Sequence, residues 1–549
     1  MSTNQSDATS QYCPFKLRRF CLKAFFLYLP FLIIFILFPI YLLWHAYLDY
    51  RIDSEIQAVR DRQGHNLITA QDLTEKYEVI DEPNLADYLN FHISVLAKSD
   101  DKYTADNNPK DPETATPAQL AATLFPGMTP YELDEWTSIN QTPPDILISA
   151  TENYLKAQQP VLDPLLNLPP YQTAVWTKNY NDGIAVLLPH LGNLRRAART
   201  LKIYNWLAVH QNRSQDSLRA LTSLKHFADS LNNEPILITY LVNISIRSLL
   251  YEQIELGLNH HIYNDSQLQQ LAALAEPINV KDSFLHSMLG ERAALLHYLD
   301  NIYKNPKFTM DFAGDPIPYP VVFLQHHLGL LKTDTLAAIK LHNKVYDEFQ
   351  KPIPDISSLD DQIVDLNRLT TMHTRYIFPA LGAADQSFEK VHHKAVTLQI
   401  ALAIERFYLA NRDEVSSLHE ALPNDLHELV PDYLAAVPVD MTLGKSGRGK
   451  IAAPEYQYIH DDHGYIIYTL GRDKTDNLGC PFNSNGNITN GNPNDPSDIT
   501  TAVTFPGSQQ NILQSQYPQA YQKFADNITT AHEEYFSFIN TKDPDDQSN

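Results

Sequence analysis

Residues 24–48 read AFFLYLPFLIIFILFPIYLLWHAYL, a run without a single formally charged residue. A helix that crosses the hydrocarbon core of a bilayer needs about 20 apolar residues, so this run is long enough to span a membrane with some tilt. It ends in Trp44 and Tyr47, aromatic residues that favour the membrane–water interface. A cleavable signal peptide has a shorter apolar core followed by small residues at its cleavage site, and no such site follows here. The sequence therefore predicts a retained, single-pass transmembrane helix rather than a buried core helix.

The flanking charges predict how this helix is oriented. Residues 1–23 form a basic tail whose only acid is Asp7, whereas the far side of the run begins with Asp49 and Asp53. Because positively charged flanks stay in the cytoplasm, we expect a cytoplasmic N-terminus and an exported body. In a Gram-negative cell the protein would lie in the inner membrane, with its bulk in the periplasm.

Charge and cysteine content narrow the class of protein. The net charge is -23 although the basic tail is positive, so the exported body is strongly acidic. An acidic surface is repelled by nucleic acid, and we therefore predict no nucleic-acid partner. The cysteines are Cys13, Cys21 and Cys480, which leaves Cys480 alone in the exported part and excludes a disulfide framework there.

The chain beyond the anchor divides by composition. Residues 49–124 are predicted to form a juxtamembrane stalk and a polar, proline-containing linker. Residues 125–385 carry apolar side chains at helical spacing, and short loops between the segments predict antiparallel neighbours. This large helical domain resembles stacked helical hairpins of the tetratricopeptide kind, although no 34-residue repeat is present. Within it, Glu291 and Arg292 are interpreted as a structural ion pair or, alternatively, a ligand clamp.

Residues 386–507 change character. A long apolar helix over 390–411 is followed by two short runs rich in β-branched and aromatic residues, 456–459 and 465–470, around a glycine-containing turn. This pattern predicts a β-hairpin. The fold class expected for the whole chain is therefore mainly α, with one transmembrane helix, a large antiparallel helical domain and a smaller α+β module containing a short antiparallel sheet.

The α+β module resembles a known family. Leu-Pro-Asn-Asp-Leu-His-Glu-Leu-Val-Pro at 422–431, Val-Pro-Val-Asp at 437–440 and Thr-Leu-Gly-Arg-Asp at 469–473 occur in the order found in the globular domain of type II secretion system pseudopilins. The resemblance covers residues 390–499 and implies a pilin-like fold. Two departures matter: the module's helix lies far from the N-terminus, and no prepilin cleavage motif precedes the membrane helix. The resemblance therefore implies a structural or docking module rather than a pilus subunit.

The same resemblance implies a calcium site in the loop after the hairpin. Calcium takes six to eight oxygen ligands from carboxylates and carbonyls. The ligand positions carried over from the family fall on Asp473, Asp495 and Asp498, and the backbone carbonyl of Leu470 and the carboxylate of Asp476 could supply further oxygens. The alternative is a solvated loop without metal, because this loop contains a long Asn/Gly insert.

Residues 508–549 are predicted to form an amphipathic helix and a disordered tail. Apolar residues from Tyr517 to Phe538 alternate at spacings of three and four, which places them on one helical face. This face docks on its own domain, or on a protein partner or a second copy of the chain.

No catalytic motif is found. Residues 444–450 match the first part of a phosphate-binding loop, but Ile451 stands where serine or threonine would bind magnesium. The function expected is therefore that of a membrane-anchored extracytoplasmic binding or scaffolding protein. The alternatives are an exported hydrolase with its site in the helical domain, and a secretion-system accessory protein.

Overall fold

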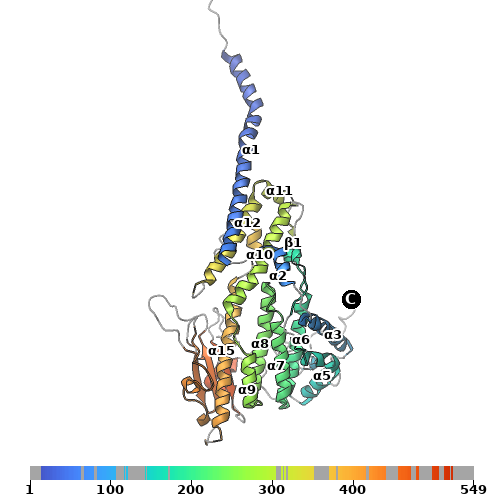
Figure 1. Cartoon of the computed structure of the whole chain (residues 1–549), viewed down its shortest axis with the longest axis vertical. Helices are drawn as coiled ribbons and strands as arrows, with labels where there is room; N and C mark the ends of the chain where they lie inside the picture. The colour runs from blue at the N-terminus through green and yellow to red at the C-terminus, as the bar shows by residue number, and fades with distance from the viewer. Residues whose placement is uncertain are drawn as a thin grey trace, which may run out of the picture. The chain divides into compact units, whose positions relative to one another are not determined.

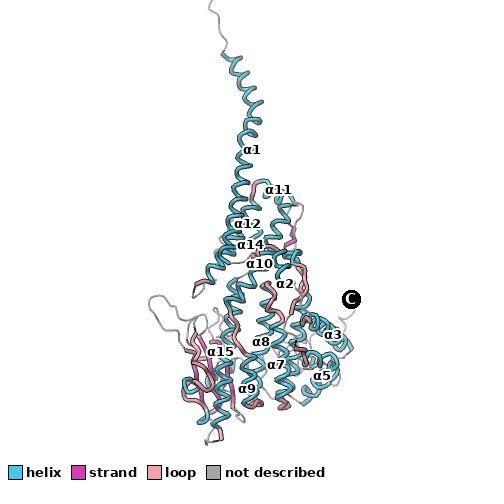
Figure 2. The backbone as a smooth tube through the Cα atoms, viewed as in Figure 1, coloured by secondary structure: helices cyan, strands magenta, loops and turns pink. Residues whose placement is uncertain are grey.

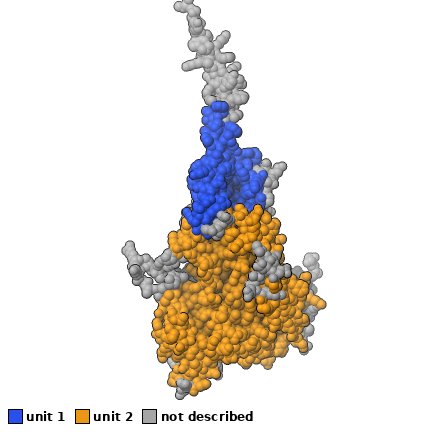
Figure 3. All heavy atoms as spheres, in the orientation of Figure 1, with its two compact units in different colours: residues 1–66, 295–343, 365–378 blue, residues 67–294, 344–364, 379–549 orange. Residues whose placement is uncertain are grey.

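The computed structural model of the chain is mainly helical, with a small three-stranded antiparallel sheet (Figure 1, Figure 2). It forms two compact units, coloured separately in Figure 3. Unit 1 comprises residues 1–66, 295–343 and 365–378, and unit 2 comprises residues 67–294, 344–364 and 379–549. The structure describes the following residues: 14–63, 67–78, 83–106, 116–117, 119–120, 143, 145–170, 174–304, 311–312, 315–316, 319–351, 370–378, 381–413, 415, 419–440, 455–470, 476, 478–480, 498–505, 512–519 and 521–523.

Unit 1 is built around α1 (Pro14–Gln63), which continues without a break past the predicted span of 24–48. Residues 24–34 of that span lie outside the residues whose side chains are described. A search of the described residues finds no helix with the length and apolar content to cross a bilayer. The other elements of unit 1 are the following: the end of α10 (Val280–Lys304), β1 (Asp311–Phe312), β2 (Asp315–Pro316), α11 (Tyr319–His327), most of α12 (Leu330–Phe349) and α14 (Met372–Ile377).

Side chains from other helices complete the packing of unit 1. The short helix α14 has no capping side chain at its own N-terminus, and Asp334 of α12 supplies one by accepting the backbone N–H groups of His373 and Thr374, at 2.8 and 3.0 Å. Burial raises the pKa of Asp334 to about 6, although these hydrogen bonds oppose the rise.

Unit 2 contains a helical stack, as the periodicity predicted, and the connections from α6 to α10 are short. The helices are α2 (Ala70–Tyr77), α3 (Leu85–Asp106), α5 (Asp145–Leu166), η2 (Tyr180–Ala185), α6 (Pro189–His210), α7 (Ser214–Asp229), α8 (Leu237–Asn259), α9 (Asp265–Leu274) and the first part of α10. Neighbours α6, α7 and α8 pack on one another, and their contact faces bury large side chains such as Trp206, Phe227 and Tyr251. The end of α9 nearer the N-terminus is fixed by a capping box in which Asn264 and Gln267 exchange side-chain and backbone hydrogen bonds.

Glu291 and Arg292 do not behave as the sequence suggested. The Glu291 carboxylate accepts the backbone N–H of Leu237 at 3.0 Å, at the start of α8, where the N-cap residue has no capping side chain. The Arg292 guanidinium instead donates to the backbone oxygen of Leu67 at 2.6 Å. Each side chain therefore serves a separate backbone group, which the sequence could not indicate because both partners come from other segments.

The α+β module belongs to the same compact unit as the helical stack. It consists of α15 (Leu381–Asn411), η3 (His419–Ala421), η4 (Leu426–Leu429), β3 (Gln457–Asp461), β4 (Gly464–Thr469), β5 (Ile499–Thr504) and α16 (Ile512–Gln516). The sheet order is β3-β4-β5, and both pairs are antiparallel. The predicted hairpin is confirmed as β3 and β4, whereas β5 was not predicted. β4 begins at Gly464, where only glycine fits. Its φ is +150°, and a Cβ there would lie 2.0 Å from the Val503 oxygen.

The first turns of the predicted C-terminal helix pack on the sheet of their own module. Ile512 joins Ile466 and Tyr468 in a buried apolar cluster, and Tyr517 packs against its rim. The rest of the predicted helical face, from residue 524 onward, lies outside the described residues.

Candidate functional site

The loop predicted to bind calcium is described only in part. Asp473 and Asp495 lie outside the described residues, whereas Leu470, Asp476 and Asp498 lie within them. Among the residues that can be assessed, no group of three or more His, Cys, Asp or Glu side chains is arranged to hold a metal ion. The calcium site therefore remains a prediction.

The two described aspartates of this loop lie close together. Asp498 is fully buried, and its carboxylate accepts the backbone N–H of Gly479 at 2.8 Å, while its own N–H donates to the Cys480 oxygen at 3.1 Å. Asp476 accepts the N–H of Leu478 at 2.8 Å. Burial raises the pKa of Tyr468, and the carboxylates of Asp476 and Asp498 add to this rise. Both carboxylates thus lie near one tyrosine ring, where the two ends of the loop meet.

The outer edge of β5 is covered by side chains instead of a fourth strand. Asn259, the last residue of α8, accepts the backbone N–H of Thr504 at 2.9 Å and donates to the Ala502 oxygen at 3.0 Å. One helical turn earlier, the Glu255 carboxylate accepts the N–H of Ala502 at 2.9 Å. Side chains at i and i+4 on a helix lie about 5–6 Å apart, close to the repeat of about 7 Å between alternate residues of a strand. A helix can therefore pair with this edge.

Two further side chains, Lys394 and His261, contact the same edge of β5. Lys394 of α15 donates to the Thr500 oxygen at 2.6 Å and forms an ion pair of 2.6 Å with Glu255. His261, which follows α8 in the left-handed conformation with a φ of +49°, lies 2.7 Å through Nε2 from the Thr504 oxygen. The backbone groups that Thr500, Ala502 and Thr504 direct outward are thus met by the helical stack and α15.

His261 also contacts a buried carboxylate. Its Nδ1 lies 3.0 Å from Glu405 Oε2, and the other carboxylate oxygen accepts the hydroxyl of Tyr465 at 2.8 Å. Both ring nitrogens of His261 face acceptor oxygens, so the imidazolium form donates two hydrogen bonds here, whereas a neutral ring donates one. Burial opposes this charge, but the attraction of Glu405 and the two hydrogen bonds raise the pKa of His261 above its usual value.

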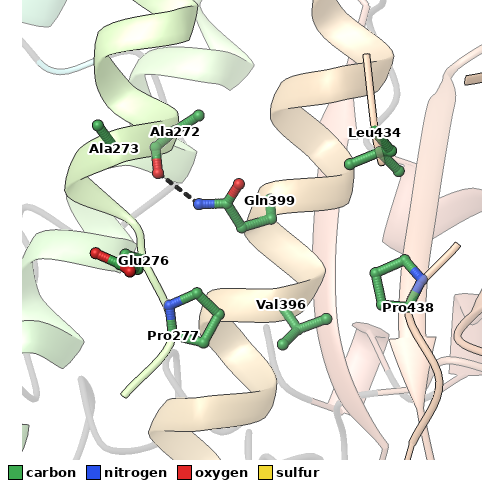
Figure 4. Close-up of a pocket in the computed structure, with 8 residues that line it drawn as sticks. All are labelled: Ala272, Ala273, Glu276, Pro277, Val396, Gln399, Leu434 and Pro438. Atoms are coloured by element: carbon green, nitrogen blue, oxygen red, sulfur yellow. Dashed lines mark hydrogen bonds between the residues drawn. The ribbon is translucent and has the colours of Figure 1, made fainter. Parts of the chain in front are cut away.

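An apolar cleft lies between α9 and α15, beside the loop that leads to the sheet (Figure 4). Its volume is about 610 Å³, within the range of about 300–1,000 Å³ typical of ligand pockets. Figure 4 shows Gln399 of α15 facing the C-terminal end of α9, where its amide donates to the Ala272 oxygen at 2.5 Å. Its lining residues are Ala272, Ala273, Glu276, Pro277, Val396, Gln399, Leu434 and Pro438. Among these described lining residues, Glu276 is the one titratable residue.

A second cleft, formed by α5, α6 and α7, is polar and has a volume of about 790 Å³. Part of its charge is already paired, because Asp216 forms ion pairs with Arg213 at 2.7 Å and with Arg219 at 2.5 Å. The hydrogen bond that Arg219 donates to Asp216 raises the pKa of Arg219, and burial together with the Asp216 charge raises the pKa of Tyr204. Both shifts move the pKa of the group further above neutral pH, whereas acid–base catalysis requires a pKa near the working pH.

A buried cluster of charged groups in the helical stack was missed by the sequence analysis. Glu234 forms an ion pair with Lys178, its carboxylate lies 3.2 Å from His190 Nε2, and it accepts the hydroxyl of Thr239 at 2.8 Å. Burial alone would raise the pKa of Glu234, but the hydrogen bond from His190 and the charge of Lys178 outweigh it and lower the pKa. The side chains of Lys178 and Glu234 are each 3% exposed, so solvent reaches neither of them. The cluster is therefore a structural ion network.

Comparison with models of protein families, with curated proteins and with solved structures gives no match to this chain.

Proposed function

We propose that the chain is a membrane-anchored binding or scaffolding protein, which presents the apolar cleft between α9 and α15 to a segment of a partner protein. The observation that carries this proposal is the composition of the cleft. Only one of the eight described lining residues is titratable, and Figure 4 shows the Glu276 carboxylate pointing away from α15. Such a lining suits the burial of apolar side chains.

The shared edge of β5 supports a scaffolding role. The cleft takes Ala272 and Ala273 from the helical stack, Val396 from α15 and Pro438 from the α+β module. The hydrogen bonds of Glu255 and Asn259 to β5 hold these parts in one arrangement. A preformed cleft loses less conformational entropy on binding than one that must assemble.

The exported hydrolase is the weaker candidate. It would need acid–base groups converging in a cleft, and the polar cleft of α5, α6 and α7 is the better of the two on this count. However, Asp216 is already engaged by two arginines there. The pseudopilin-like module and the role of a secretion-system accessory rest on the resemblance of residues 390–499 alone.

Membrane anchoring through residues 24–48 forms part of the proposal and can be tested separately. A periplasmic reporter fused after Asn549 is expected to be active, and the full chain is expected to stay with membranes in alkaline carbonate. Release by carbonate, or activity of a cytoplasmic reporter at the same position, would refute the anchored topology.

The cleft can be tested by photo-crosslinking in native membranes. A photoreactive phenylalanine is placed at Ala273 in the cleft and, as a matched control, at Ala157, an exposed alanine of α5. We expect a discrete protein adduct at Ala273 only, and we expect a second substitution in the lining, Leu434→Arg, to abolish it. Equal adducts at both positions, or none at Ala273, would contradict the proposed role of the cleft.

A further inference from the structure

Helix α11 and the turn after it expose a group of large apolar side chains in unit 1. Val321 is 42% exposed, Phe323 46%, Leu324 56% and Leu328 52%. Val322, between them, is 1% exposed, so α11 is held by its opposite side. Contiguous exposed apolar side chains mark a surface that is covered in the working protein. We call Val321, Phe323, Leu324 and Leu328 the α11 patch.

The α11 patch is fixed to one level of α1. The indole N–H of Trp44 donates to the Leu328 oxygen at 3.2 Å. The next residue, Gly329, turns the chain with a φ of +71°, and a Cβ there would lie 2.9 Å from atoms of both Trp44 and Leu48. The turn therefore packs against α1 at residues 44–48, with no space for a side chain at Gly329.

The character of α1 changes at this same level. On the N-terminal side, Phe35, Phe38 and Leu43 are 80%, 57% and 70% exposed. On the C-terminal side the charged residues begin with Asp49, which forms an ion pair of 2.6 Å with Lys332 of α12. Trp44 and Tyr47 occupy the transition, as expected of aromatic residues at a membrane–water interface. The patch thus continues the apolar surface of α1 at the point where that surface ends.

We propose that the α11 patch lies in the outer membrane–water interface and is a second contact of this protein with lipid, besides α1. This inference rests on the anchored topology proposed above. The occupant is lipid because the apolar surface of α1 runs directly into the patch, and because the ion pair of Asp49 and Lys332 marks where water begins. Apolar side chains of this kind insert into the headgroup and acyl boundary, as in helices that lie along a membrane.

The test places an environment-sensitive NBD dye at single cysteines of the full chain. The background carries Cys13→Ser, Cys21→Ser and Cys480→Ser, and the protein is reconstituted into phosphatidylcholine vesicles containing doxyl-labelled lipid. The dye is attached at Leu324→Cys in the patch, at Phe35→Cys in the proposed span, and at Arg60→Cys. Arg60 lies exposed on α1, about 24 Å beyond Trp44 along the helix.

We expect blue-shifted emission and lipid quenching at Leu324 of at least half the extent seen at Phe35, and none at Arg60. Quenching at Phe35 with none at Leu324 would overturn the α11 inference and leave the anchor intact. A lack of quenching at Phe35 would overturn the anchor and, with it, the premise of this inference. A blue shift at Leu324 without lipid quenching would show that protein covers the patch, which also overturns the inference.

Discussion

Replacing Asn259 by leucine removes one of the two α8 side chains that pair with the edge of β5, while keeping a side chain of similar size; Glu255 keeps its bond to Ala502. The Asn259 amide accepts the Thr504 N–H and hydroxyl, both at 2.9 Å, and donates to the Ala502 oxygen at 3.0 Å. Leucine leaves two backbone groups of a partly buried strand without these partners. Each buried group left unsatisfied costs about 1–3 kcal/mol, so we expect Asn259→Leu to lower the free energy of unfolding by about 2–4 kcal/mol.

Asn259→Asp distinguishes the hydrogen bond that Asn259 accepts from Thr504 from the one that it donates to Ala502. Aspartate keeps an acceptor for Thr504 but places a carboxylate oxygen against the Ala502 oxygen, and we expect a loss of about 1–2 kcal/mol. The matched control is Asn167→Leu, because Asn167 is exposed and donates only to the Asp163 oxygen of its own helix, at 2.9 Å. That control is expected to change stability by less than about 0.5 kcal/mol.

The assay combines urea unfolding of the full chain with hydrogen exchange of the peptide containing residues 499–505. Asn259→Leu should lower the urea midpoint and speed exchange at Ala502 and Thr504, since edge strands open locally when their partners are lost. The reasoning is wrong if Asn259→Leu is as stable as the Asn167→Leu control, or if exchange in β5 is unchanged.

Three further outcomes follow from the same structure. His261→Gln should destabilise the chain most at low pH. Because the folded pKa of His261 is raised, its contribution to stability is fully present below its unfolded pKa of about 6.5 and is lost as pH rises through the folded value; its ionisable neighbours are Glu405, Arg412 and Tyr408. Urea unfolding of both proteins between pH 5 and 9 measures the difference in stability, and a difference that grew with pH would count against this prediction. Gly290→Ala should lower the free energy of unfolding by about 1–3 kcal/mol, because its Cβ would lie 2.1 Å from the Pro235 oxygen. Gly192→Ala, with no atom within 4 Å of its Cβ, should be neutral or stabilising in thermal melting. Equal melting temperatures for the two variants would reject the steric argument. Calcium should raise the melting temperature of the full chain by about 2–5 °C, and Asp473→Ala should remove this rise. Asp413→Ala is the control and should keep the rise, because the Asp413 side chain is 91% exposed. A melting curve that does not change with calcium would contradict the predicted site.

The helices could be predicted because their signal is local. Apolar periodicity predicted the helical character of residues 125–385, to which α6, α7 and α8 belong, and the glycine-containing turn predicted the β3–β4 hairpin. Strand β5, with the sequence ITTAVT, was missed because its edge partners lie in α8, about 245 residues away in the chain. No window of sequence contains both sides of such a contact.

The polar junctions were predicted less well than the helices, for a related reason. Glu405 follows the apolar run 400–404 of α15 and is itself buried, and an acid at the end of such a run was a usable signal that its carboxylate has a buried partner. The identity of the partner, His261, depends on the turn after α8 and could not be read from either segment. The Lys178–Glu234–His190 network likewise joins residues 44–56 positions apart, none of which is unusual in its own neighbourhood.

The way α8 covers β5 has a consequence for dissecting this protein into pieces. A fragment beginning at residue 386 would lack Glu255, Asn259 and His261, and would expose a strand whose hydrogen-bonding groups are open to other chains. During synthesis the helical stack emerges first and is already available when β5 leaves the ribosome, which limits intermolecular pairing of nascent chains. The C-terminal module is thus a dependent part of the protein, and expression of it by itself is expected to give aggregates.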